Sequence, residues 1–309
     1  MTEEELRRLA RIKGNLERRS FIYQAIRRFF CEQGFLEIET PVRMPAIAPE
    51  QFIVPIESEG WFLSTSPELH MKRLMAAGYR QLFQISRCFR KGERGRWHNP
   101  EFTMLEWYRT DADYLQMIQD TEMLVSAIAR QFGQQAVVSY GNRKIDLTPP
   151  WPRLTVQQAF LNTAKWDPVT EPDSYRFDLD LVEKVIPSFT RDRPTVLLDY
   201  PATMASLALL KRSDPAVAER AEVFIGGLEI ANAYSELVDA DEQKRRFHEE
   251  AEIIMQEQGR KAPLPERFLE VLPYLPECGG IALGVDRLMM LFCDALSIDE
   301  VMGFTVDNI

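Results

Sequence analysis

The chain has 309 residues, 45% of them hydrophobic and 27% charged, a composition that can bury a core and excludes a disordered chain. Its net charge is −10, so it has no overall attraction to nucleic acid. Four cysteines without a C-x-x-C pair and only three histidines argue against a structural zinc site and for a reducing compartment. Without a signal core or a membrane-length apolar run, the sequence predicts a cytoplasmic protein with no membrane partner.

The first half of the chain predicts a long helix, short strands and a hairpin. Thr2 followed by Glu5 is typical of a capping box, and the helical periodicity continues to Gly34. FLEIETP and WFLS predict strands, and the segment after Pro67 predicts a helix. QLFQISRCFR and FTMLEWYR predict an antiparallel hairpin with a long loop over 91–100, and residues 111–133 predict an amphipathic helix.

The second half begins with the least patterned part of the chain. Residues 134–175 contain PPWP and polar turns, and we expect a surface insertion there. TVLLDYP predicts a strand, AEVFIGGLEIANAYSEL a hairpin turning at its two glycines, and residues 239–259 a charged helix. GGIALGVDRLMMLFCDAL predicts a strand that runs directly into an apolar helix. Antiparallel strands with segregated helices indicate an α+β fold, which we expect to form a single domain over residues 1–309.

Two predicted strands carry aromatic rings and acids on one face. Because side chains alternate along a strand, every second residue shares a face. If both faces line one pocket, its aromatic walls and carboxylates suit an amine; otherwise the acids are ordinary solvent-exposed groups. The residues that share these faces are Phe102, Met104, Glu106 and Tyr108 in one strand, and Asn232, Tyr234 and Glu236 in the other.

Other segments suit an anion. Arg90 ends a strand just before the loop that contains Arg94, Arg96 and His98, and arginine fits phosphate in a bidentate way. Arg287 lies on the first turn of a predicted helix, whose N-terminus attracts anions. Glu222 and Glu229 lie on the two arms of one hairpin, an arrangement that suits Mg²⁺. Taken singly, the basic loop and the acid pair are more often ordinary solvated surface, and the Arg287 segment is also compatible with a simple strand-to-helix packing corner.

Five ordered segments together carry a family resemblance. GFLEIETP, FRKGERGRWHNPEFTMLEWY and ALGVDRL resemble the three motifs of class II aminoacyl-tRNA synthetases, and TSPELHMKRL and GGLEIANAYSEL resemble lysyl-tRNA synthetase in particular. The resemblance implies a class II catalytic domain, an antiparallel sheet flanked by helices, and a homodimer built through the first motif. Because that motif begins at Gly34, we expect no anticodon-binding domain. The chain most resembles the truncated lysyl-tRNA synthetase paralogues that ligate (R)-β-lysine to elongation factor P.

This resemblance implies an AMP-forming ligase. It would use ATP and Mg²⁺ to activate (R)-β-lysine or lysine as an acyl-adenylate, and would transfer it to a lysine side chain of elongation factor P, without tRNA. Two alternatives stay open: a minimal lysyl-tRNA synthetase without an anticodon domain, and a non-catalytic paralogue that senses lysine or nucleotide. A relative that handles aspartate or asparagine would need a cation where this chain has acids.

The resemblance also implies residue roles. Arg90 and Arg287 would be catalytic, Arg90 at the α-phosphate, and Phe102 and Arg287 would enclose the adenine. Glu222 and Glu229 would bind Mg²⁺. The nucleotide site would comprise Arg90, Lys91, Gly92, Glu93, His98, Asn99, Phe102, Glu229, Ile230, Gly284 and Arg287. The amino-acid site would comprise Ser66, Pro67, Glu68, Glu106, Tyr108, Asn232, Tyr234, Glu236 and Ala282, with Glu68 at the amine nearer the carboxylate and Glu106, Tyr108 and Glu236 at the distal ammonium.

Two positions depart from the synthetase pattern. Gly92 stands where lysyl-tRNA synthetases usually carry the acid that reads the adenine amino group, and Glu93 is the expected replacement. Ala282 stands where the synthetases usually have glycine. One methyl group on a pocket wall discriminates between substrates by about 1–3 kcal/mol, and we interpret Ala282 as favouring the β-amino acid.

Overall fold

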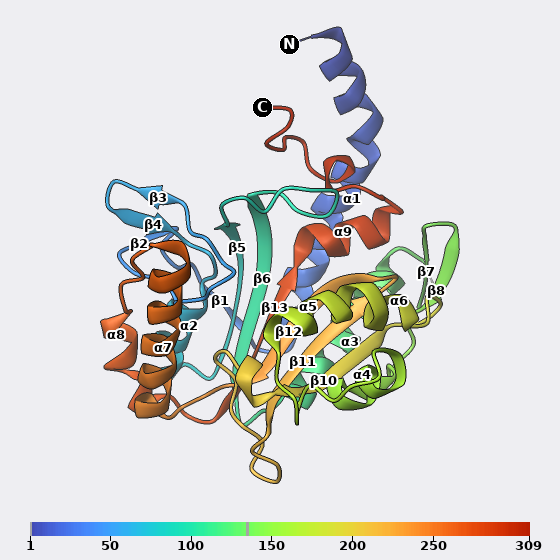
Figure 1. Cartoon of the computed structure of the whole chain (residues 1–309). Helices are drawn as coiled ribbons and strands as arrows, with labels where there is room; N and C mark the ends of the chain where they lie inside the picture. The colour runs from blue at the N-terminus through green and yellow to red at the C-terminus, as the bar shows by residue number, and fades with distance from the viewer. Residues whose placement is uncertain (1, 134–135) are drawn as a thin grey trace.

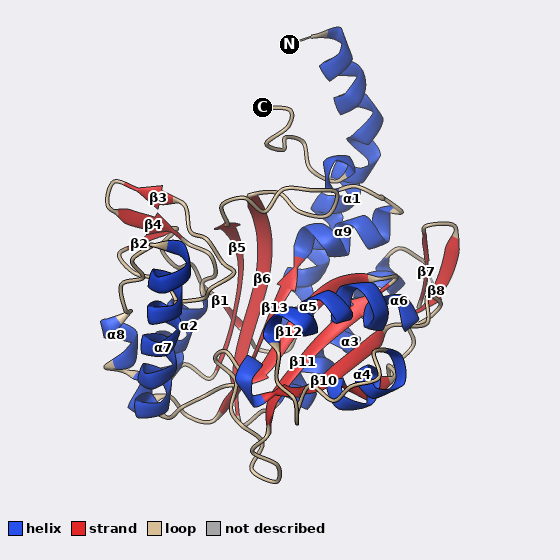
Figure 2. Cartoon of the chain, in the orientation of Figure 1, coloured by secondary structure: helices blue, strands red, loops and turns tan. Residues whose placement is uncertain are grey.

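The computed structural model describes residues 2–133 and 136–309, and an eight-stranded mixed sheet runs through its centre (Figure 2). The neighbouring strands across the sheet pair antiparallel from β5 to β10, whereas the edge strands β1 and β9 each pair parallel with their neighbour. The α+β prediction is therefore confirmed, with two parallel edges that the sequence did not indicate. In spatial order the strands are β1 (Leu36–Glu37), β5 (Gln81–Phe89), β6 (Glu101–Thr110), β13 (Cys278–Gly284), β12 (Leu228–Ser235), β11 (Val217–Ile225), β10 (Thr195–Pro201) and β9 (Arg153–Thr155).

One face of the sheet packs against three helices around the main hydrophobic core. They are α1 (Glu3–Glu32), α3 (Tyr114–Gln131) and α9 (Val285–Cys293). Alternate β6 residues Leu105 and Trp107 point into this core. Both ends of α1 follow the predicted signals: the Thr2 hydroxyl accepts the Glu5 amide, and Gly34 has φ +80°. At α3, Asp113 forms a capping box that the sequence analysis did not predict. Because side chains alternate along a strand and Trp107 is fully buried in this core, Glu106 and Tyr108 point to the opposite face of β6.

The other face is covered only at its two ends (Figure 1). At the β1–β5 end lie α2 (Glu68–Ala76), α7 (Ala240–Gln258), α8 (Glu266–Leu269) and η3 (Leu272–Tyr274), which share a second hydrophobic cluster. At the β10–β9 end lie α4 (Val156–Thr163), α5 (Ser174–Asp180), η1 (Leu181–Val185), α6 (Ile186–Ser188) and η2 (Ala202–Met204), over a third cluster. The central strands β6, β13, β12 and β11 stay uncovered between these two groups.

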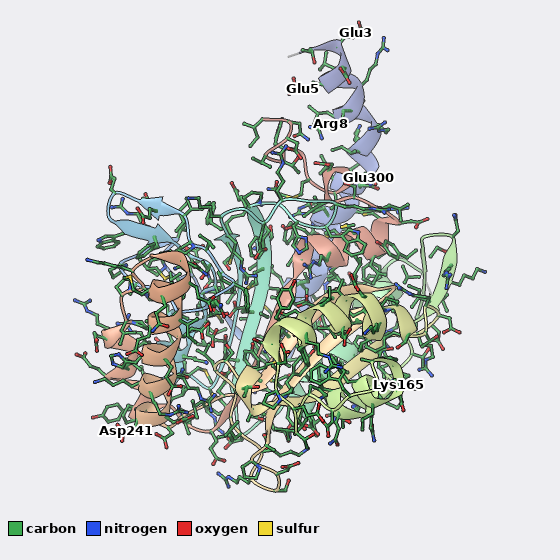
Figure 3. The ribbon with its side chains drawn as sticks, in the orientation of Figure 1. Glu3, Glu5, Arg8, Lys165, Asp241 and Glu300 are labelled. Atoms are coloured by element: carbon green, nitrogen blue, oxygen red, sulfur yellow. The ribbon has the colours of Figure 1, made fainter. Side chains whose placement is uncertain are left out.

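The remaining elements lie at the periphery. A small sheet joins β2 (Arg43–Met44), β4 (Trp61–Leu63) and β3 (Glu57–Ser58), and β7 (Val137–Tyr140) pairs with β8 (Arg143–Asp146). The C-terminal segment, with η4 (Ile298–Glu300), runs beside the projecting α1 (Figure 3). There Arg8 donates to the Gly303 carbonyl at 2.6 Å and Asn15 to the Glu300 carbonyl at 2.9 Å. In the part of the chain that the structure describes, no helix is both long and apolar enough to cross a bilayer.

Most predicted elements are present, and the departures lie in the least periodic segments. The strand predicted over 35–41 is reduced to β1. The predicted surface insertion includes residues 134 and 135, which lie outside the described residues, but its remainder contributes β9 to the main sheet and buries Trp151, Val156 and Phe160. That packing corrects the interpretation of 136–175 as surface structure; whether the segment is an insertion relative to other proteins stays a prediction. The helices over 174–188 were not predicted.

Candidate active site

A cleft of about 1020 Å³ opens over the uncovered centre of the sheet. Its floor is made by β6, β13, β12 and β11. One wall comes from α7 and the loop 49–53, and the opposite wall from α5 and η2. The loop 93–99 and the start of α9 close one end, and Ser66 with Glu68 at the start of α2 line the other.

The strand register aligns the side chains of the cleft floor in rows that run across the sheet. Residues paired across neighbouring strands point to the same side, so each row presents one band of side chains to the cleft. One row joins Gln84, Glu106, Ala282, Asn232 and Glu222, and the next joins Leu82, Tyr108, Gly280, Tyr234 and Arg220. The two strand faces predicted from parity therefore do meet in one cleft, with Ala282 between Glu106 and Asn232.

A buried lysine organises the acidic end. Lys72 Nζ lies 2.5 Å from Glu68 Oε1 and 2.5 Å from Glu236 Oε2, and its side chain is 1% exposed. Burial alone would lower the pKa of Lys72, but Glu236 and Glu68 outweigh it and raise that pKa well above its ordinary value. The ammonium therefore stays charged and holds the two carboxylates together.

Glu106 forms a second contact network beside this lysine. Its carboxylate accepts the Ser66 hydroxyl at 2.6 Å and the Tyr108 hydroxyl at 2.8 Å. Burial, reinforced by the nearby Glu68 charge, raises the pKa of Glu106 to about 7. A carboxyl group in this state releases its proton readily when a cation arrives.

Gly280 makes room for these groups. A Cβ atom at this position would collide with Glu236 Oε1 and with the Tyr108 ring. Glycine at this position of β13 therefore leaves the space that the Glu236 carboxylate and the Tyr108 ring occupy.

The opposite end of the cleft is cationic. Arg90 lies over the Phe102 ring at 5.1 Å and forms a 3.5 Å ion pair with Glu93. Arg90 Nε is buried and has no hydrogen-bond partner among the described residues, and the same holds for Asn232 Oδ1 on the floor. Such unsatisfied groups on a cleft wall indicate a site built for a polar ligand.

Arg287 forms the second cationic contact at this end. It donates to the Glu229 backbone carbonyl at 2.9 Å and pairs with the Glu229 carboxylate at 3.2 Å. Its other terminal nitrogen lies 2.6 Å from His98 Nε2, so the ring nitrogen accepts. Burial, with help from Arg287, lowers the pKa of His98 and keeps the ring neutral.

Two acids of the β11–β12 hairpin line the cleft within range of each other's charge. Glu222 accepts from Arg220 at 2.8 Å, and Glu229 pairs with Arg287. Burial raises the pKa of Glu222, and the neighbouring Glu229 charge adds to this, although Arg220 opposes it. Two adjacent carboxylates with mutual repulsion fit a divalent cation that takes few protein oxygens and keeps its waters. Within residues 2–133 and 136–309 there is no cluster of three or more metal-ligating side chains.

The structure brings together nearly all the predicted site residues. Every one lines the cleft except Pro67, Lys91 and Gly92. Pro67 is buried at the N-cap of α2, and the Lys91 amide donates to the Val54 carbonyl at 2.7 Å, which leaves Lys91 and Gly92 exposed on the outside of the loop.

The sequence prediction missed Lys72, which lies buried against Glu68 and Glu236, and several residues that line the cleft, among them Glu50, Arg220 and Gly280. The spacing of Lys72 four residues after Glu68 is a signal for a helix-surface pair, and strand parity with Glu222 could have found Arg220. No periodic pattern marks the other two.

Comparison with known proteins places the chain in a family. The chain matches the sequence model of the class II tRNA synthetases (D, K and N) over residues 5–308, and it belongs to that family. The eight-stranded sheet and its flanking helices are the class II synthetase domain.

Relatives at the level of individual proteins share one name. The chain is 38% identical to the elongation factor P–(R)-β-lysine ligase of Pectobacterium carotovorum subsp. carotovorum, over 96% of each chain. It is 39% identical to the protein of the same name from Klebsiella pneumoniae (strain 342), over 95% of each chain. The corresponding protein of Salmonella gallinarum is 38% identical over 95% of each chain.

Proposed function

We propose that this protein activates (R)-β-lysine, or lysine, with ATP and transfers it to a lysine side chain of elongation factor P. The names of its relatives support the reaction and the acceptor. The observation that carries the proposal for this chain is a cleft that is anionic and aromatic at one end and cationic at the other. We also propose that the protein acts in the cytoplasm, as a homodimer joined through its first motif.

The charges at the acidic end support a substrate with two ammonium groups. Glu68, Glu106 and Glu236 provide three carboxylates, and Lys72 provides one ammonium. Burial raises the pKa of Glu236 to about 8, although Lys72 opposes the increase. Two negative charges remain unbalanced once Glu106 and Glu236 have released their protons, and a diamino acid neutralises both. An acidic amino acid would add charge of the wrong sign, so aspartate is disfavoured.

The cationic end supports the chemistry of activation. A carboxylate oxygen of the amino acid attacks the α-phosphorus of ATP, the bond to the β-phosphate oxygen breaks, and pyrophosphate leaves with the electron pair. Arg90 holds the α-phosphate and stabilises the charge that develops on it. Phe102 and Arg287 enclose the adenine ring, and Glu93 replaces the adenine-reading acid absent at Gly92.

Mg²⁺ completes the proposal for the nucleotide end. Glu222 and Glu229 would hold it, because they are adjacent carboxylates on the cleft floor. When bound, the ion neutralises phosphate charge. Arg220 and Arg287 neutralise the same two carboxylates in the protein alone, which keeps the pair stable without the ion.

Ala282 supports the choice of the β-amino acid. Its methyl group stands in the floor row between Glu106 and Asn232, where it shortens the space available beside the substrate backbone. We propose that this favours the displaced amine of (R)-β-lysine by about 1–3 kcal/mol over α-lysine.

Mass spectrometry of the acceptor tests the function. Purified elongation factor P, incubated with the enzyme, ATP and (R)-β-lysine, should gain the mass of one β-lysyl group on a lysine side chain. A parallel incubation with tRNA should give no aminoacyl-tRNA. Charged tRNA with unmodified elongation factor P would instead support the minimal synthetase, and no product in either incubation would reject both transfer reactions.

A further inference from the structure

The acids that line the cleft differ in whether the carboxylate already has a partner. We call an acid uncommitted when its carboxylate receives no hydrogen bond and forms no ion pair. Glu68 and Glu236 pair with Lys72, Glu106 accepts two hydroxyls, and Glu222 and Glu229 pair with arginines. The other acids on the cleft walls have similar partners. Across residues 2–133 and 136–309, only the carboxylates of Glu50 and Asp178, among cleft acids, receive no hydrogen bond and form no ion pair.

These two uncommitted acids occupy different environments. Asp178 is exposed on α5, at the outer wall of the cleft. Glu50 is half-buried on the loop between β2 and β3, and the charged groups that act on it are Arg90 just after β5, Arg220 on β11, Glu68 on α2 and Glu250 on α7. Arg90 and Glu68 are the residues proposed to hold the α-phosphate and the amine nearest the carboxylate. Glu50 therefore lines the same cleft as these two residues and lies within range of both of their charges.

The backbone around Glu50 is firmly held. The Gln51 amide donates to Glu250 Oε1 at 2.6 Å, and Gln258 on α7 donates to the Gln51 carbonyl at 2.7 Å. On the other side, the Lys91 amide donates to the Val54 carbonyl at 2.7 Å. The loop is thus fixed to α7 and to the loop that follows Arg90, and Glu50 is presented to the cleft from a fixed position.

The charges of the amino-acid substrate are balanced in the activation step without Glu50. Two charges of the substrate and one of Lys72 already match Glu68, Glu106 and Glu236. The transfer step brings one more cation, because a lysine side chain has a pKa of about 10.4 and arrives protonated. That amine cannot attack a carbonyl until it loses a proton, so the second reaction needs a base that the first does not.

We propose that Glu50 is the general base of the transfer step, a role that rests on the proposed function. The Glu50 carboxylate takes one proton from the acceptor ammonium. The freed nitrogen attacks the adenylate carbonyl carbon and forms the C–N bond. The bond between that carbon and the phosphate oxygen then breaks, AMP leaves with the electron pair, and the second nitrogen proton goes to the departing phosphate or to water.

The protonation behaviour of Glu50 is consistent with this task. Burial in the cleft raises its pKa to about 7; Arg90 and Arg220 oppose the increase, and Glu68 and Glu250 add to it. A base whose pKa lies near the working pH is about half ionised there, so it can accept a proton and also holds it strongly enough to assist the reaction.

Separate assays of the two half-reactions test the proposal with Glu50→Gln. Pyrophosphate exchange reports activation, and single-turnover decay of preformed adenylate reports transfer. Because general bases contribute about 10²–10⁴-fold, transfer to elongation factor P should fall at least about 100-fold, with a loss in exchange at least tenfold smaller. Asp178→Asn is the matched control, since it also removes one uncommitted cleft acid, and it should change transfer by less than about threefold.

Small amines separate failure of this role from failure of the proposed function. Methylamine is protonated at neutral pH like a lysine side chain, whereas hydroxylamine is largely unprotonated. Glu50→Gln should slow methylamine acylation strongly and hydroxamate formation little, even if elongation factor P is not the acceptor. Equal losses with both amines, parallel losses in exchange and transfer, or an equal effect of Asp178→Asn would overturn the assignment. Unmodified elongation factor P with the wild-type enzyme would reject the proposed function alone.

Discussion

Replacing Lys72 with methionine tests the charge arrangement at the acidic end. The Lys72 ammonium is buried and lies 2.5 Å from a carboxylate oxygen of both Glu68 and Glu236. Removing one partner from a buried ion pair costs about 3–5 kcal/mol, because an uncompensated charge remains. The folded variant can escape this cost only if one carboxylate takes up a proton.

The cost of that proton depends on pH in a calculable way. An ordinary glutamate has a pKa of about 4.3, and each pH unit above it costs about 1.36 kcal/mol, so protonation costs about 3.7 kcal/mol at pH 7 and about 1 kcal/mol at pH 5. The folded variant raises the pKa of an acid, so its stability deficit must grow as pH rises. We expect a deficit near 4 kcal/mol at pH 7, by this estimate, and about 1 kcal/mol at pH 5.

Urea unfolding of both proteins at the two pH values measures this deficit. Lys13→Met is a matched control, since Lys13 and Glu17 have the same helical spacing but are exposed and 3.8 Å apart. It should cost less than about 1 kcal/mol at either pH. A Lys72→Met deficit that is equally large at pH 5 and pH 7, or below about 1 kcal/mol at pH 7, would refute the reasoning.

Three further predictions concern activity. Arg90→Ala should abolish pyrophosphate exchange without unfolding the protein. Arg94→Ala is the control and should leave exchange intact, because Arg94 and its partner Asp307 lie outside the cleft. Near-normal exchange in Arg90→Ala would remove Arg90 from the mechanism. Glu236→Gln should raise the KM for the amino acid far more than that for ATP, and equal increases would indicate a structural role. Because the pKa of Glu106 is about 7 and only its ionised form attracts an ammonium, the amino-acid KM should fall about tenfold from pH 6 to pH 8. Glu106→Gln should weaken this pH dependence and leave the part due to Glu236, whose pKa is about 8, and a wild-type KM that stays constant would contradict the prediction.

Strand pattern predicted the cleft floor well, because the pleat fixes which side chains share a face. Glu106 and Tyr108 line the cleft together with Asn232 and Tyr234, as their alternation indicated. The sequence could not show that β6 and β12 lie on either side of β13, since that order depends on pairing between strands distant in the chain. The family resemblance implied only an antiparallel sheet flanked by helices.

The remaining site residues depend on tertiary packing that no local pattern encodes. Lys72 pairs with a neighbour on its own helix, but its burial depends on Glu236, which arrives from a distant strand. Glu50 lies in a loop without periodicity and gains its environment from α7 and from Arg90, just after β5. The sequence pattern of residues 136–175 predicted a surface segment, because β9 is only three residues long and pairs with β10, which is distant in the chain.

Amino-acid-dependent exchange of pyrophosphate into ATP tests the central claim most directly. The purified protein should catalyse exchange with (R)-β-lysine, more weakly with α-lysine, and at background level with aspartate or with no amino acid. Exchange that is absent with both diamino acids, or that aspartate supports equally well, would contradict the account of a cleft that joins a diamine to a nucleotide.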